Sequence, residues 1–179
     1  ISALEVEGIA DGRFQLASLQ DQATLKGSLH VEGLEINDFP IGEVDLSAAM
    51  EERDLRLNLE NFFNEQKKIA IDGTIDLDSK NLDFDAKLTQ ANLVIFEPFL
   101  SKYISNLGGT LSGSLQLQGN LDSPELIGST RVEQGKLRIN YLNTSYQLDG
   151  SLLFRPTQVS FQDLACVMGM ATPLPLPEE

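Results

Sequence analysis

The chain has 179 residues, of which 41% are hydrophobic and 22% charged, and its 27 acidic residues outnumber 13 basic ones to give a net charge of −14. This is the composition of a globular protein, and the acidic excess argues against nucleic-acid binding or docking onto an anionic membrane, both of which need clustered Lys and Arg. The single cysteine, Cys166, rules out an internal disulfide. The sequence has no run of 18 or more apolar residues, the length needed to span a membrane.

Alternating apolar and polar residues dominate the first 92 positions. The phrase Gly-Ser-Leu-His-Val-Glu-Gly at 27–33 is typical, and related phrases recur at 72–78, 113–119 and 149–154. A period of two places every second side chain on one face of a strand. The predicted strands here cover residues 4–6, 14–16, 25–31, 44–48, 55–59, 69–77 and 82–88.

The period changes between residues 93 and 107. Helical spacing is seen in Phe96, Phe99, Leu100, Tyr103, Ile104 and Leu107. Pro98 suits a first helical turn and Gly108-Gly109 a stop. The pattern predicts a short amphipathic helix over about 96–107 that covers the apolar face of the sheet. In a sharper interpretation, Phe96, Phe99, Tyr103 and Ile104 form a plug or gate on a lipid path.

Strand patterns resume after this segment. They cover residues 111–117, 126–132, 137–141, 146–154 and 159–161. The last residues contain three prolines and no alternation, so 1–165 is predicted as one β-segment and 166–179 as a poorly ordered tail. Because the pattern is already under way at residue 4, the chain is expected to be part of a longer protein.

Glycines interrupt several strands where an apolar residue is expected. They are Gly27, Gly73, Gly113 and Gly128. Glycine within a strand often marks a bend or a close backbone approach, and bends at similar places would fold one long antiparallel sheet into a U-shaped hydrophobic trough. The predicted lining of its groove, for lipid or client, is Leu57, Ile71, Ile75, Leu115, Leu117, Leu137, Ile139 and Leu148.

Catalytic and metal-binding constellations are not seen in the sequence. The only histidine, His30, lies among apolar residues that face the other way, and no phosphate loop or nucleophile elbow occurs. Five aspartates cluster around one hairpin, but they alternate with apolar residues and so indicate a solvated face; they are Asp72, Asp76, Asp78, Asp83 and Asp85. We expect no enzymatic activity, no metal and no cofactor.

Residues 107–128 read Leu-Gly-Gly-Thr-Leu-Ser-Gly-Ser-Leu-Gln-Leu-Gln-Gly-Asn-Leu-Asp-Ser-Pro-Glu-Leu-Ile-Gly, followed by Val-Glu-Gln-Gly-Lys-Leu-Arg-Ile at 132–139 and Tyr-Gln-Leu-Asp-Gly at 146–150. This pattern resembles the C-terminal conserved region of the TamB family, the inner-membrane component of the translocation and assembly module, within the AsmA-like group. The match covers about a third of the chain, and the first 95 residues or so share only the general strand repeat.

The resemblance implies a β-taco fold in the periplasm, anchored in the inner membrane by an N-terminal helix absent from this sequence. It implies a role in outer-membrane biogenesis through phospholipid transport between membranes, outer-membrane β-barrel assembly, or both. The implied partners are phospholipid acyl chains or nascent β-strands, and a TamA- or BamA-like outer-membrane barrel protein. Two alternatives stay open from the residues: a β-sandwich or β-solenoid stalk of a surface adhesin, and a chaperone whose edge strands pair with an incoming strand.

Overall fold

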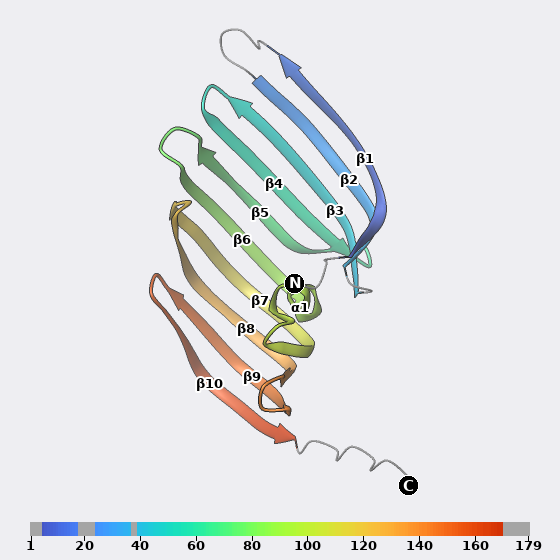
Figure 1. Ribbon diagram of the computed structural model, residues 1–179, viewed down its shortest axis with the longest axis vertical. Helices are drawn as coiled ribbons and strands as arrows, with labels where there is room; N and C mark the ends of the chain where they lie inside the picture. The colour runs from blue at the N-terminus through green and yellow to red at the C-terminus, as the bar shows by residue number, and fades with distance from the viewer. Residues whose placement is uncertain (1–4, 18–23, 37–38, 170–179) are drawn as a thin grey trace.

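The computed structural model describes residues 5–17, 24–36 and 39–169, and these form one ten-stranded antiparallel sheet in which every strand pairs with its neighbours in sequence (Figure 1). The strands are β1 Val6–Ala17, β2 Thr24–Ile36, β3 Phe39–Glu51, β4 Asp54–Phe63, β5 Gln66–Asp76, β6 Asn81–Asn92, β7 Ile104–Asn120, β8 Ser123–Ile139, β9 Thr144–Arg155 and β10 Gln158–Gly169. The all-β class and the long antiparallel sheet are therefore confirmed.

Tight turns explain why most strands pair with the next in sequence. Between β4 and β5 the whole connection is Asn64 and Glu65, both with positive φ (52° and 61°). Two consecutive residues of this kind form the turn whose twist matches a β-hairpin. A connection this short leaves the next strand no place except beside the previous one.

The register gathers the apolar side chains on one side of the sheet. Leu57 of β4 lies opposite Gly73 of β5, which lies opposite Phe84 of β6. Phe84 in turn lies opposite Leu117 of β7, which is paired with Leu126 of β8. Directly opposed residues point to the same face, so this row crosses five strands on one face, which we call the apolar face.

Bulges keep the longer strands in phase with that face. The register shifts between Leu88 and Ala91 of β6 and between Val132 and Gly135 of β8. In each case the bulge contains a residue with positive φ, Gln90 (49°) or Gln134 (52°). An extra residue on one strand re-aims the side chains that follow, so apolar residues three positions apart still share the apolar face.

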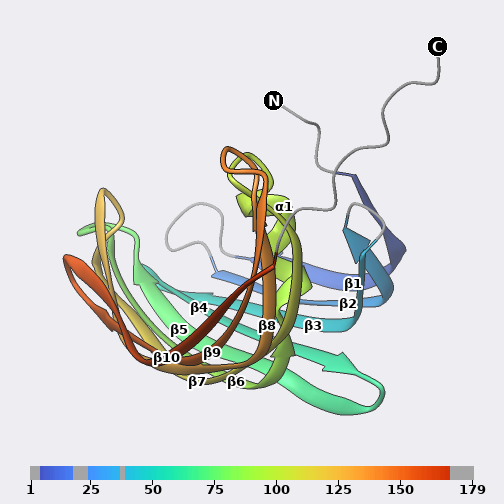
Figure 2. The ribbon, with the colours of Figure 1, turned by 90° about the horizontal axis from the view of Figure 1, so that it is seen from below.

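The strands curve toward the same side (Figure 2). The connection between β6 and β7 lies on the inner side of this curve and packs on the apolar face through Leu93 and Phe96. The buried cluster beneath it consists of Leu88, Ala91, Leu111 and Val132.

The predicted helix over 96–107 is wrong. The chain forms a 3-10 turn, η1 Leu93–Phe96, then a single α-helical turn, α1 Glu97–Leu100, and re-enters the sheet at Ile104. Ile104 and Leu107 do share a face, as the spacing suggested, but a bulge with Asn106 at φ 56° produces that spacing. A bulged strand can therefore imitate the three-residue spacing of a helix.

The C-terminal boundary also differs from the prediction. β10 continues to Gly169, and Cys166 is paired with Leu148 of β9. Residues 166–169 therefore belong to the sheet, and the rest of the predicted tail, 170–179, lies outside the described residues. Within the described part of the chain, no helix is long and apolar enough to cross a membrane.

Candidate functional site: the apolar face

The eight residues predicted to line a groove all lie on the apolar face. Leu57 and Leu117 belong to the row described above, and Ile71 and Leu115 flank Ala86 in the next row. The other four are Ile75, Leu137, Ile139 and Leu148, which the register places on the same side. All eight are half-buried. Their role as the lining of a groove stays a prediction.

Few apolar side chains are fully covered in the described part of the chain. The buried ones are Ile41, Leu82, Leu88, Ala91, Leu107, Leu111 and Val132. Four of them form the buried cluster, which gains its cover from the segment Leu93–Tyr103, named here the strap. The rest of the apolar face carries no second layer among the described residues.

The four residues predicted as a plug are separated by the structure. Phe96 packs against the buried cluster, whereas Tyr103 is 63% exposed at the end of the strap. Ile104 begins β7 and pairs with Ile139. Phe99 lies in α1, and its side chain is outside the described part of the structure. Phe96, Tyr103 and Ile104 therefore do not form one helical stripe.

Hydrogen bonds hold the strap at its first turn and at its centre. The Asn92 side-chain oxygen accepts from the backbone N–H of Val94 at 3.0 Å. The Glu97 carboxylate accepts from the backbone N–H groups of Asn106, at 3.1 Å, and Leu107, at 2.8 Å. These two donors lie in the β7 bulge, where the ladder with β8 is interrupted, so Glu97 supplies the partner that the ladder does not.

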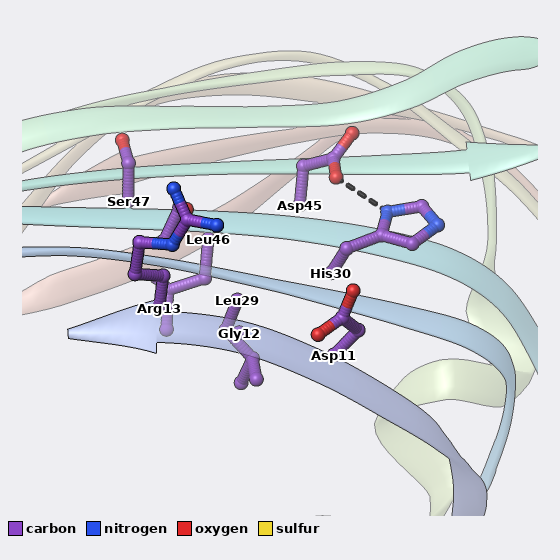
Figure 3. Close-up of a pocket in the computed structure, with 9 residues that line it drawn as sticks. Asp11, Gly12, Arg13, Leu29, His30, Asp45, Leu46 and Ser47 are labelled. Carbon is purple, nitrogen blue, oxygen red and sulfur yellow. Dashed lines mark hydrogen bonds and ion pairs between the residues drawn. The ribbon is translucent and has the colours of Figure 1, made fainter.

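The opposite, polar face holds a hollow on β1–β3, shown in Figure 3. In it, Nδ1 of His30 lies 2.6 Å from a carboxylate oxygen of Asp45. This hydrogen bond raises the pKa of His30 above 6.5, and the charges of Asp45, Glu32 and Glu43 add to the rise. Asp11 and Arg13 complete the rim, so the hollow is a mixed-charge surface.

The hairpin aspartates are spread along the polar side and the turn. Asp72 lies opposite Asp85 across β5 and β6. Asp76 accepts from the backbone N–H groups of Asp78 and Ser79, at 2.8 Å and 3.0 Å. Hydrogen bonds from Ser79 lower the pKa of Asp76. Across the described ranges, no group of three or more His, Cys, Asp or Glu side chains is placed to hold a metal ion.

Two buried polar residues on the apolar face were missed by the sequence analysis. The Asn61 side-chain nitrogen donates to the carbonyl oxygens of Ile41, at 2.9 Å, and Glu43, at 3.1 Å. Thr130 is 3% exposed, and its hydroxyl has no partner among the described residues. The sequence does contain a signal for Asn61, because it is a polar residue at the position where the alternation of Leu55, Leu57 and Leu59 predicts an apolar one.

Comparison with known proteins completes the description of the site. The sequence model of the TamB N-terminal domain matches residues 5–132. The family predicted from the sequence is therefore confirmed. The matching region is the N-terminal domain rather than the C-terminal conserved region. It includes most of the first 95 residues, in which the sequence pattern showed only the general strand repeat. No curated protein and no solved structure matches the chain. A match over well more than half of its length shows that the chain belongs to the TamB family of translocation and assembly module proteins.

Proposed function

We propose that this chain is a non-enzymatic segment whose curved sheet forms a U-shaped trough, a β-taco, and shields apolar cargo from water. The observation that carries the proposal is the apolar face itself. It crosses the sheet with only the strap for cover among the described residues. A sheet with one apolar face needs a partner layer, and a phospholipid acyl chain is such a layer.

The energetics suit this cargo. Burying a methylene group stabilises by about 0.8 kcal/mol, so an acyl chain lying along half-buried Leu and Ile side chains gains several kcal/mol without any polar contact. The adhesin stalk is less well supported. A β-sandwich needs a second sheet and a solenoid needs parallel coils, whereas the described strands form one antiparallel sheet.

In the cell, we place the segment in the periplasm, as part of a protein attached to the inner membrane. There it would carry phospholipid between the membranes, support outer-membrane β-barrel assembly, or do both, together with a TamA- or BamA-like barrel protein. Membership of the TamB family supports this placement.

A specific observation favours the strand-chaperone role as a second candidate. β1 and β10 each pair with only one neighbour in the described structure. β1 also exposes large apolar side chains, including Ile9 at 73% and Phe14 at 61%. An incoming β-strand can add to such an edge through backbone hydrogen bonds.

The test places a charge on each side of the same strand. Leu115→Asp charges the apolar face, and Ser114→Asp charges the exposed polar face one residue earlier. Phospholipid that co-purifies with the protein is measured by native mass spectrometry, and folding is measured by circular dichroism.

We expect Leu115→Asp to lose co-purifying phospholipid while keeping its β-sheet spectrum, and Ser114→Asp to retain both. The same charge introduced at Ile139 should behave like Leu115→Asp. If Leu115→Asp unfolds, the position is closed core and the trough is wrong. Equal lipid content in both variants would also contradict the proposal.

A further inference from the structure

The strap lies where cargo would lie. Leu93 and Phe96 pack against the buried cluster, which is the continuation of the apolar face beyond Leu115. These two side chains therefore take up apolar surface that an acyl chain would otherwise contact. At this end of the sheet, the strap covers the apolar surface that cargo would cover elsewhere.

The strap also reaches strands far from its own in the sheet. η1 contacts β3, although β4 and β5 separate β3 from β6, a distance of roughly 14 Å in a flat sheet. A small hollow is lined from one side by Pro40, Ile41 and Asn61, and from the other by Asn92 and Ile95. The strap thus bridges the inner side of the curve from β7 to β3 (Figure 2).

Its attachment is light for a segment in this position. The ordered elements are a four-residue 3-10 turn and a four-residue helical turn, and helices this short have no stability of their own in water. Leu100 is 38% exposed, and Tyr103 63%. The Glu97 carboxylate attaches the centre of the strap to the β7 bulge through two hydrogen bonds.

We propose that the strap is a displaceable cover over the buried cluster and that Glu97 is its latch. When the two hydrogen bonds to Asn106 and Leu107 break, the strap leaves the apolar face. The acyl chain of a phospholipid then lies on the surface of Leu88, Ala91 and Leu111. This inference rests on the proposed function and adds a gate to it.

Asn140 makes a second attachment that remains when the latch opens. Its side-chain nitrogen donates to the carbonyl oxygen of Ser101 at 2.9 Å, and its backbone N–H donates to that of Tyr103 at 3.0 Å. Ser105 also donates to its side-chain oxygen at 2.6 Å. The strap is therefore fixed at one end by chain continuity with β6 and at the other by Asn140, and its centre around Phe96 and Glu97 is the part that moves.

The first experiment tests, in the absence of any ligand, whether Glu97 holds the strap against the sheet. Glu97→Ala removes the acceptor, and Glu97→Gln leaves one acceptor and sets an N–H₂ group against the second backbone donor. Glu35→Ala, at an exposed glutamate on β2, is the control. Hydrogen exchange is followed by mass spectrometry on peptides that cover 92–108 and on peptides from β2–β4.

Both Glu97 variants should exchange the amides of Asn106 and Leu107 faster, by about tenfold for Glu97→Ala, because local opening governs exchange. Peptides from β2–β4 should exchange as in the native protein, which shows that the sheet is intact. Unchanged exchange at Asn106 and Leu107 in both variants would show that Glu97 is not a latch.

The second experiment asks whether the strap controls access. The probe is phosphatidylethanolamine with a fluorescent label on one acyl chain, and its uptake is followed by the rise in fluorescence. The strap is locked to β3 by Pro40→Cys and Ile95→Cys in a Cys166→Ser background, joined by a short bismaleimide whose addition is confirmed by mass. The same double-cysteine protein before cross-linking is the matched control.

Glu97→Ala should take up the probe several-fold faster than the native protein, and the cross-linked protein several-fold more slowly than its uncross-linked control. If the native protein binds the probe and neither change alters uptake, the gate is wrong while the proposed function stands. If neither the native protein nor Glu97→Ala takes up the probe, both the gate and the lipid-carrying function are wrong.

Discussion

Glycine and phenylalanine face each other across neighbouring strands at two places on the apolar face. Phe14 lies opposite Gly27, and Phe84 lies opposite Gly73. A Cβ atom on Gly27 would lie 2.2 Å from the Phe14 ring, and one on Gly73 would lie 2.4 Å from the Phe84 ring. Each ring therefore lies over the backbone of a glycine and fills the space of the missing side chain.

Gly73→Ala should lower the free energy of unfolding by about 1–3 kcal/mol, the usual cost of overpacking. The added methyl would also lie 2.3 Å from the carbonyl oxygen of Asp83, which cannot move as a side chain can. The control is Gly108→Ala, where a Cβ meets only Lys136 at 4.0 Å. Urea denaturation of both variants measures the difference, and equal stability would contradict this role of Gly73.

Because the sequence has a single histidine, the pKa of His30 can be measured without overlap from other histidines and reports on the charges in the polar hollow. Because the hydrogen bond to Asp45 is the main cause of the raised pKa of His30, Asp45→Asn should lower that pKa. A pKa raised on folding stabilises the folded state fully below the unfolded value near 6.5, and the contribution is lost as the pH rises through the folded pKa. The stability advantage of the native protein over Asp45→Asn should therefore be larger at pH 6 than at pH 8.5.

Titration of the His30 ring protons by NMR measures the pKa directly, and denaturation at the two pH values measures the stability. Glu32→Gln, which removes a weaker charge from the same surroundings, should lower the pKa less than Asp45→Asn does. A pKa of His30 that does not change in Asp45→Asn would show that the hydrogen bond is absent in solution.

Among the elements, β3 and β4 are joined by a side chain as well as by their ladder. The ladder begins at Glu43, opposite Phe62, and the Asn61 side chain binds the carbonyl oxygens of Ile41 and Glu43. Asn61 is 4% and Ile41 7% exposed, and the hydrogen bond between them is buried, so the Ile41 carbonyl group has no ready access to water if Asn61 is removed.

Asn61→Leu should therefore cost about 1–3 kcal/mol of stability despite restoring the apolar alternation, because it leaves the buried carbonyl oxygen of Ile41 unpaired. Asn58→Leu, on the opposite face of the same strand, is the control and should cost far less. Thermal unfolding followed by circular dichroism compares the two. A variant at Asn61 as stable as the native protein would contradict the inferred role of its amide.

The hairpin of β5 and β6 carries the aspartate cluster. Asp76 is engaged with the turn, and the Arg53 side chain forms an ion pair with Asp78. We expect calorimetric titration with calcium to show no binding tighter than millimolar. A micromolar site accompanied by a higher melting temperature would contradict this expectation.

On the scale of the whole molecule, stability should fall from the centre of the sheet to its edges. β6–β9 surround the buried cluster and pair on both sides, whereas β1 is exposed along its entire length and pairs only with β2. Amide exchange reports local opening, which is cheapest where few contacts are broken. Peptides from β1 should exchange first and those from β7 and β8 last, and uniform protection across the sheet would contradict this order.

Much of the architecture could be predicted from the sequence. The two-residue alternation assigns a face to each strand without reference to its neighbours, because side chains on a strand point alternately to its two sides. The eight predicted groove residues accordingly lie on one face. Where a connection is short, as at Asn64 and Glu65, it restricts a strand to pairing with the next. The phrases at 107–150 were enough to identify the TamB family.

Other features depend on contacts between distant residues. A bulge forms only against a partner strand, so the three-residue spacing of Ile104 and Leu107 resembled a helix until β8 was in place. Asn61 finds its acceptors 18 and 20 residues away, and Glu97 finds its donors across the bulge that it stabilises. Alternation along the chain determined the strands and their faces, whereas the strap, its latch and the curvature beneath it were decided by the tertiary structure, because each requires backbone groups that only the assembled sheet brings together.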